Sequence, residues 1–120
     1  MGKYVDGFLI PIKKKNLKEY KKMARIGCEV WMEHGALDYY ECDGAVLENT
    51  WGLPFTKLCK LKADETVIFA FIIYKSKAHR NSVTKKVHKD PRMKPENFTK
   101  MPFDMKRFST GEFKVLVSAK

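Results

Sequence analysis

Histidine is the side chain that best exchanges protons near neutral pH, and His79 has the strongest claim to such a role in this 120-residue chain. On a helix it shares one stripe with Val83 and Val87, so it faces the core or a pocket. It also falls in the first turn, where the helix dipole favours a neutral ring that accepts a proton. We therefore name His79 as the candidate catalytic base. The alternative is a core histidine that bonds a backbone carbonyl.

A second group of side chains would line a small-molecule pocket between helices and sheet. Trp31 and His34 lie on the apolar arc of a first helix, and Tyr39 and Glu41 lie on the strand that follows. Aromatic walls with a few polar groups are the usual form of such a site. We expect these four residues to bind a small, anionic or aromatic ligand, with His79 beside them.

Three further residues are candidates for the mouth of this pocket. Arg80 and Arg92 would clamp a carboxylate or phosphate, and Trp51 would form a lid. As alternatives, Arg92 pairs with Asp90 or Asp104, and Trp51 is a hydrophobic plug.

The histidines and cysteines follow no metal-binding or cofactor-binding motif. The three histidines are too scattered for a pattern such as HExxH, and Cys28, Cys42 and Cys59 show no CxxC spacing. Their odd number also argues against a disulfide framework, so a reducing cytoplasm suits these thiols. We expect no metal and no cofactor.

The hydrophobic pattern predicts the elements that position these residues. The expected strands are 4–12, 36–43, 64–74 and 113–118, with a short edge strand at 55–62. Two helices are expected, one from Asn16 to Gly35 and one from Ser76 to just before Pro91. The order strand, helix, strand, strand, helix, strand predicts a single α+β domain over residues 1–120, with both helices on one face of an antiparallel sheet.

Both helices carry start signals at their first turns. Asn16 with Glu19 three residues later forms the pattern of a capping box, and Ser76 is suited to cap the second helix.

The segment VIFAFIIY, residues 67–74, is apolar on both faces of a strand, and Tyr4 to Ile10 shows the same character. A sheet covered by helices on one face should alternate apolar and polar residues. Burial of the second face against a second copy of the chain would explain the pattern, so we predict a homodimer formed through the sheet face.

Composition gives the remaining limits. The formal net charge is +10, which attracts anionic partners without naming one. The start of the chain lacks the apolar core of a signal peptide, and no apolar run is long enough to span a membrane. We expect a cytoplasmic protein with no membrane association.

Several motifs together closely resemble one family, the YbaA-like family of unknown function, number 1428. The motifs are KYVDGFLIPI, EHGALDYYECDG, DETVIFAFIIYKSKAHRNSV, KVHKDPRM, MPFDMKR and GEFKVLV. The resemblance implies a dimeric α/β barrel, a form of the ferredoxin-like fold in which two sheets pack face to face. Relatives of that fold include cofactor-independent oxygenases, heme-degrading enzymes and proteins of no known activity. Met105 and Glu112 stand where the family pattern has glycine.

Three functions remain open at this point. The first is a homodimer that binds a small ligand, with no assigned activity. The second is a cofactor-independent oxygenase or isomerase with His79 as base. The third is RNA binding, because residues 69–74 fit part of the RNA-recognition strand pattern. The dimer would occupy the face that RNA needs, so we expect no nucleic-acid partner.

Overall fold

Two long strands, β1 (Tyr4–Lys13) and β3 (Glu65–Tyr74), run antiparallel through the centre of a four-stranded sheet. The edges are β2 (Asp38–Asp43), which pairs with β3, and β4 (Ser109–Lys114), which pairs with β1. The computed structural model describes residues 2–49, 51–98 and 100–120. The order β2-β3-β1-β4, with every neighbour antiparallel, is that of the ferredoxin-like fold.

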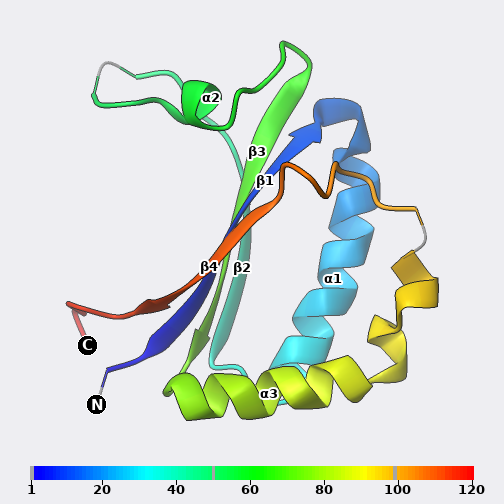
Figure 1. Cartoon of the computed structure of the whole chain (residues 1–120), viewed down its shortest axis with the longest axis vertical. Helices are drawn as coiled ribbons and strands as arrows, with labels where there is room; N and C mark the ends of the chain where they lie inside the picture. Colours follow the sequence, from blue (N-terminus) through cyan, green and yellow to red (C-terminus); the bar gives the residue numbers. More distant parts are fainter. Residues whose placement is uncertain (1, 50, 99) are drawn as a thin grey trace.

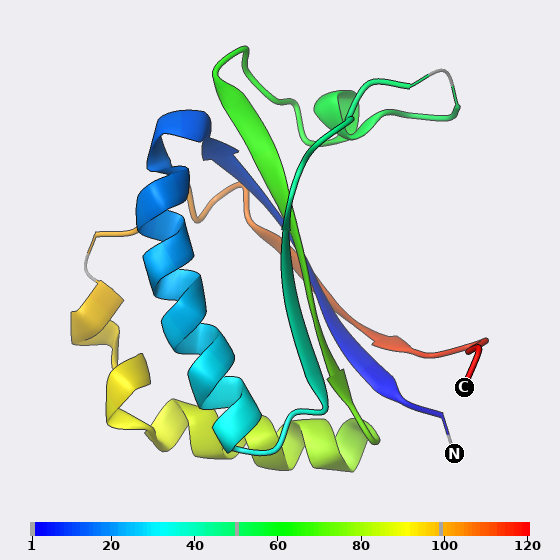
Figure 2. The ribbon, with the colours of Figure 1, turned by 180° about the vertical axis from the view of Figure 1, so that it is seen from behind.

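Both long helices lie on one side of the sheet (Figure 1, Figure 2). α1 (Leu17–Glu33) runs along the sheet, and α3 (Lys77–Lys89) crosses its lower end in the view of Figure 1. Short 3-10 turns follow β1 and α3: η1 (Lys14–Asn16), η2 (Pro91–Met93) and η3 (Pro95–Phe98). The predicted α+β class is therefore confirmed.

The pleat of the two central strands sorts their side chains between two faces. Ile10, Ile68 and Ile72 point toward the helices and are buried, whereas Phe69 points the other way and is 49% exposed. Val67, also on the outer side, is buried near the backbone of Gly44, which donates to its carbonyl at 3.1 Å. The two-sided apolar pattern of the sequence thus corresponds to one covered face and one face that is only partly covered.

The helix boundaries agree with most of the predicted signals. The Ser76 hydroxyl accepts a hydrogen bond from the His79 backbone N–H at 3.1 Å, as expected of an N-cap. Gly35 has φ +112°, a left-handed conformation that a residue with a Cβ resists. The predicted capping box is wrong, because the Asn16 side chain makes no cap bond and instead donates to the Pro102 carbonyl at 3.0 Å.

Two predicted strands differ from the structure. The edge strand expected at 55–62 is wrong: Phe55–Leu58 forms the short helix α2, and the N–H groups of Lys57, Leu58 and Cys59 bond to the nearby carbonyls of Pro54 and Phe55 instead of to a strand. The last strand is β4 at Ser109–Lys114 rather than 113–118. It runs antiparallel to β1, so its pairing stops where β1 begins at Tyr4.

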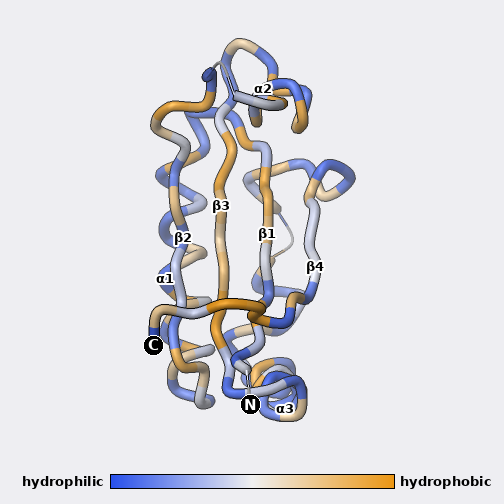
Figure 3. The backbone as a smooth tube through the Cα atoms, turned by 90° about the vertical axis from the view of Figure 1, so that its left-hand side faces the viewer, coloured by the Kyte–Doolittle hydropathy of each residue, from blue (hydrophilic) through white to orange (hydrophobic). Residues whose placement is uncertain are grey.

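Apolar residues gather on the side of the sheet that faces away from the helices. Figure 3 views this face and shows the hydrophobic colours of β1 and β3 at its centre, with the C-terminal residues passing in front of them. The excursion that contains α2 lies on the same side at the other end of the sheet (Figure 1). The exposed apolar side chains on this side include Tyr40, Trp51, Leu53, Phe69, Phe113 and Leu116.

A cluster of charged side chains fixes the chain after α3 against the end of α1. Asp90 accepts from the Arg92 guanidinium at 2.7 and 3.0 Å and from the Arg92 backbone N–H at 3.0 Å. Arg92 also donates to both oxygens of Glu33, at 3.0 and 3.1 Å, and His34 Nε2 lies 2.9 Å from Asp90 Oδ2. The cluster thereby holds η2 beside α1.

We predict that Asp90 makes the stability of the fold depend on pH in the acid range. The hydrogen bonds from Arg92, foremost among the causes, hold the pKa of the Asp90 carboxyl below its usual value. A depressed folded pKa stabilises the fold above the unfolded value of about 3.9, and this contribution is lost as the pH falls below it. In urea unfolding at a series of pH values, Asp90→Asn should flatten the acid decline in free energy of unfolding.

Removal of the Arg92 guanidinium, which lowers the pKa of Asp90, provides an independent check on this prediction. Arg92→Gln deletes the guanidinium while keeping the carboxyl, and it should flatten the same decline. A wild-type slope retained in both variants would show that the cluster does not contribute to acid sensitivity.

Candidate functional site

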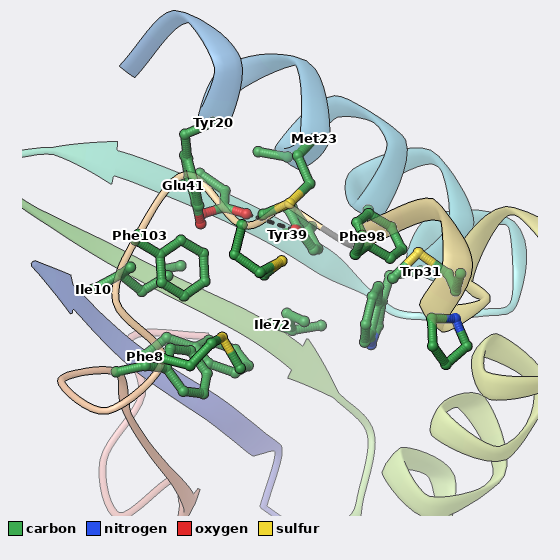
Figure 4. Close-up of a pocket in the computed structure, with 18 residues that line it drawn as sticks. Phe8, Ile10, Tyr20, Met23, Trp31, Tyr39, Glu41, Ile72, Phe98 and Phe103 are labelled. Carbon is green, nitrogen blue, oxygen red and sulfur yellow. Dashed lines mark hydrogen bonds between the residues drawn. The ribbon is translucent and has the colours of Figure 1, made fainter. Parts of the chain in front are cut away.

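A cavity of about 420 Å³ lies between α1, the inner face of the sheet and the segment 91–108 (Figure 4). α1 contributes residues three or four positions apart, which helical geometry places on one face: Tyr20, Met23, Ala24, Gly27 and Trp31. The strands contribute alternate residues of the inner face: Phe8, Ile10, Tyr39, Glu41, Ala70 and Ile72.

The third wall is a segment with little regular structure. It is rich in methionine and phenylalanine, and its lining residues include Met93, Phe98, Met101, Phe103, Met105 and Phe108. The Phe108 ring stacks on Phe8 of β1, with ring centroids 5.9 Å apart. Arg107 fixes the end of the segment, because its guanidinium donates to Glu65 at 2.6 Å and to the Cys59 carbonyl at 3.1 Å.

Gly27 allows α1 to approach the sheet closely. A Cβ atom built at this position would lie 2.9 Å from the Tyr39 hydroxyl oxygen. The missing side chain therefore leaves space for the Tyr39 phenol beneath the helix.

Glu41 is the acidic side chain of the cavity, and two phenols hold it. The Tyr20 hydroxyl donates to Oε1 at 2.5 Å, and the Tyr39 hydroxyl donates to Oε2 at 2.7 Å. Burial, and then the nearby negative charge of Glu41, raise the pKa of both phenols far above the usual value. Both tyrosines therefore remain hydrogen-bond donors at physiological pH.

A second polar chain begins at the wall of the cavity and leads away from it. The Trp31 indole N–H donates to the Tyr74 hydroxyl at 3.1 Å, and that hydroxyl donates to Asp6 at 2.9 Å. Asp6 is buried, and Arg80 balances its charge through Nε at 3.1 Å. Arg80 also lies 3.5 Å from Glu112. These bonds fix the orientation of the Trp31 ring from the side that faces away from the cavity.

The structure brings some of the predicted site residues together and separates others. Trp31, Tyr39 and Glu41 line the cavity, as expected. His34, Arg80 and Arg92 lie outside it and are engaged in the interactions with Asp90, Asp6 and Glu33 described above. Trp51 is 87% exposed and is not among the described residues that line this cavity.

His79 also lies outside the cavity. Its Nδ1 accepts a hydrogen bond from the Lys75 backbone N–H at 2.9 Å, and its ring packs edge-on against Tyr74. The Nδ1 lone pair is thus occupied by a local backbone bond and is not directed at the cavity. The sequence also allowed a core histidine bonded to a backbone carbonyl. In the structure the partner of the His79 ring is instead a backbone N–H, that of Lys75.

The sequence signals missed most of the third wall. Tyr20 was recognisable because it lies on the same apolar arc as Trp31, although its bond to Glu41 was not. The segment 91–108 contains three prolines and no periodic pattern, so nothing local indicated which of its side chains turn inward.

The described part of the chain contains no group of three or more His, Cys, Asp or Glu side chains arranged to hold a metal ion. Within the same residues, no helix combines the length and apolar character needed to cross a membrane.

Two solved structures share the fold. A dimeric ferredoxin-like protein from an uncultured marine organism superposes with a TM-score of 0.62 at 11% identity, over 99% of this chain and 100% of the other. A Bacillus cereus protein classed with the antibiotic biosynthesis monooxygenases superposes with a TM-score of 0.50 at 9% identity, over 100% and 99%. At these identities the likeness concerns the fold alone.

The sequence relatives are much closer. The uncharacterized protein YbaA of Escherichia coli K12 is 35% identical over 115 residues, which cover 96% of this chain and 97% of YbaA. YbaA of Shigella flexneri matches over the same shares of the two chains and at the same identity. Residues 3–105 match the family described as "Protein of unknown function (DUF1428)". The chain therefore belongs to the DUF1428 family, whose members include YbaA, and it has the ferredoxin-like fold.

Proposed function

We propose that the protein binds a small, largely apolar molecule in the Glu41 cavity. The observation that carries this proposal is the cavity itself: about 420 Å³, lined by apolar and aromatic side chains around one carboxylate. Ligand sites typically enclose about 300–1,000 Å³ and combine an apolar lining with a few polar groups. For comparison, a large-to-small substitution in a protein core leaves a void of about 150 Å³. The apolar and aromatic lining, and not the volume alone, distinguishes this hollow, because more polar hollows elsewhere on the described chain reach about 530 and 580 Å³.

Binding is better supported than catalysis. Glu41 is the carboxylate among the described residues that line the cavity, and both of its oxygens already accept phenolic hydrogen bonds. A substrate proton would have to compete with these two bonds for the carboxylate. The oxygenase or isomerase hypothesis with His79 as base has no support from the position of that ring.

We also propose that two copies associate through the outer face of the sheet. Phe69 and Phe113 are 49% and 58% exposed there, and the two segments that lie on the same side, the excursion with α2 and the C-terminal residues, contain Trp51 and Leu116 at 87% and 96% exposure. A flat apolar face with apolar segments at both ends fits a second copy, because two-fold packing would cover both sets at once. Obligate interfaces of this kind bury on the order of 2,000 Å² or more. The dimeric state of the marine ferredoxin-like neighbour supports a homodimer.

A reducing compartment such as the cytoplasm is the setting that we propose for this function. Cys28, Cys42 and Cys59 are free thiols in the structure, and Cys42 is exposed. Exposed free thiols are uncommon in oxidising compartments, where they tend to form disulfides.

We predict that filling the cavity will abolish ligand binding. Ala24 lies on the cavity wall, so the Phe side chain of Ala24→Phe would occupy part of the hollow. Binding of the neutral apolar fluorophore N-phenyl-1-naphthylamine should weaken at least tenfold, because the displaced volume removes most of its contacts. Fluorescence titration measures the dissociation constant.

The matched control for this substitution is Ala78→Phe, which adds the same side chain at an exposed position of α3. It should retain wild-type affinity, and circular dichroism should show that both variants are folded. Equal affinity in the two variants would mean that the probe binds elsewhere, for example on the outer sheet face, and would contradict the proposal.

We predict that the protein sediments as a dimer of about twice the 14.0 kDa of one chain, and that Phe69→Asp prevents this association. A charge at the centre of the outer face would have to be buried unpaired in the interface. Sedimentation equilibrium at micromolar concentration measures the mass. Ile26→Asp, at a site 41% exposed on α1, is the control and should remain dimeric. A well-folded wild-type monomer would contradict the dimer and leave the sheet face open to RNA.

A further inference from the structure

We infer that the ligand of the Glu41 cavity is an apolar amine, whose protonated nitrogen binds the Glu41 carboxylate. This inference rests on the proposed function, because it names the chemical class of the molecule that the cavity would bind. It depends on three features: a carboxylate without a cationic partner, a lining without a free side-chain donor, and a ring of aromatic side chains.

Glu41 differs from the carboxylates that are buried in the described part of the chain, Asp6, Glu65 and Asp90. Asp6, Glu65 and Asp90 each accept from an arginine, at 3.1, 2.6 and 2.7 Å. Within residues 2–49, 51–98 and 100–120, Glu41 accepts only from two phenols and has no ion pair. Oxygen–oxygen distances of 2.5 and 2.7 Å are typical of hydrogen bonds to an ionised carboxylate. The cavity therefore contains one negative charge that no side chain of the described chain balances.

The side-chain donors of the described lining are already engaged. The hydroxyl protons of Tyr20 and Tyr39 go to Glu41, and the indole proton of Trp31 goes to Tyr74. None of the described lining residues is a lysine, arginine or histidine. An anionic ligand would thus find no cationic side chain and no free side-chain donor, and it would meet a like charge. A carboxylate has about four lone-pair sites, so Glu41 still has capacity to accept from a ligand N–H.

The remaining lining suits a flat apolar body attached to that nitrogen. Phe103 packs near both Tyr20 and Phe108, with ring centroids 5.9 Å apart in each pair. The Trp31 and Tyr39 rings lie 6.2 Å apart beside Glu41 (Figure 4). Aromatic faces stabilise a nearby cation, most strongly where water is excluded. The aromatic side chains and the carboxylate therefore favour the same charge on the ligand.

A series of three matched ligands tests the inference. We would titrate the full-length protein with 2-naphthylmethylamine, 2-naphthalenemethanol and 2-naphthoate, which share a ring system and differ in their polar group. Isothermal titration calorimetry gives each dissociation constant. The amine should bind at least about tenfold more tightly than the alcohol, because a charge-assisted hydrogen bond adds to the ring contacts. The carboxylate should bind most weakly.

Two carboxylate variants test whether Glu41 is the group that binds the amine. Glu41→Gln should weaken amine binding at least about tenfold while changing alcohol binding much less, because only the charged interaction is lost. Glu112→Gln is the matched control: Glu112 also accepts a tyrosine hydroxyl, from Tyr4 at 2.7 Å, but lies outside the cavity. The Glu112→Gln variant should bind the amine with wild-type affinity.

The outcomes separate this inference from the proposed function. An amine that binds no more tightly than the alcohol, or a carboxylate that binds as well as the amine, would overturn the ligand class while the cavity remained a binding site. Equal loss of amine affinity in both variants would overturn the role of Glu41. Failure of all three ligands, together with failure of the neutral fluorophore, would overturn the proposed function as well. The comparison of the three ligands on the wild-type protein tests the ligand class even if Glu41→Gln does not fold.

Discussion

The pairing of β1 with β3 is the interaction on which the rest of the structure depends. The two strands are in register over ten residue pairs, from Tyr4 opposite Tyr74 to Lys13 opposite Glu65. Because side chains alternate along a strand, this register assigns every residue of both strands to one face. A shift by one position would exchange the covered and exposed faces. The cavity, the burial of Asp6 and the apolar outer face all follow from that assignment.

The cavity exists because its three walls are fixed by different means. The sheet and α1 pack through apolar side chains, with Gly27 permitting their close approach over Tyr39. The third wall is held near its ends by the ion pairs of Arg92 and Arg107, and between them by the bond from Asn16 to the Pro102 carbonyl. A wall attached at a few points can enclose a space without filling it. The methionines along it add adaptable apolar surface, since their unbranched side chains fit varied shapes.

Charge is distributed very differently over the surface and in the interior. The chain as a whole carries a formal net charge of +10, yet the cavity presents the carboxylate of Glu41. At about 0.1 M salt, exposed charges are screened over about 10 Å, whereas groups in an apolar enclosure are screened much less. In the proposed binding site, Glu41 and its neighbours would therefore act on a ligand more strongly than distant charges on the basic surface.

The sequence by itself determined the fold class, the principal elements and the two-sided apolar character of the central strands. These features come from local patterns: alternation along strands, helical spacing from Tyr20 to Trp31, and the stops at Gly35 and Pro91. It also placed Trp31, Tyr39 and Glu41 in one pocket, because spacing fixes which face each residue occupies.

Only the tertiary structure decided how the polar groups pair and where the irregular segments run. Arg80 and Arg92 carry the same chemical group wherever they lie, and their partners Asp6 and Glu33 are defined by contacts across the fold. The end of β4 depends on where β1 begins, and the path of 91–108 depends on ion pairs at its ends. Local sequence patterns encode the faces of helices and strands, but contacts between distant segments are set only when those faces come together.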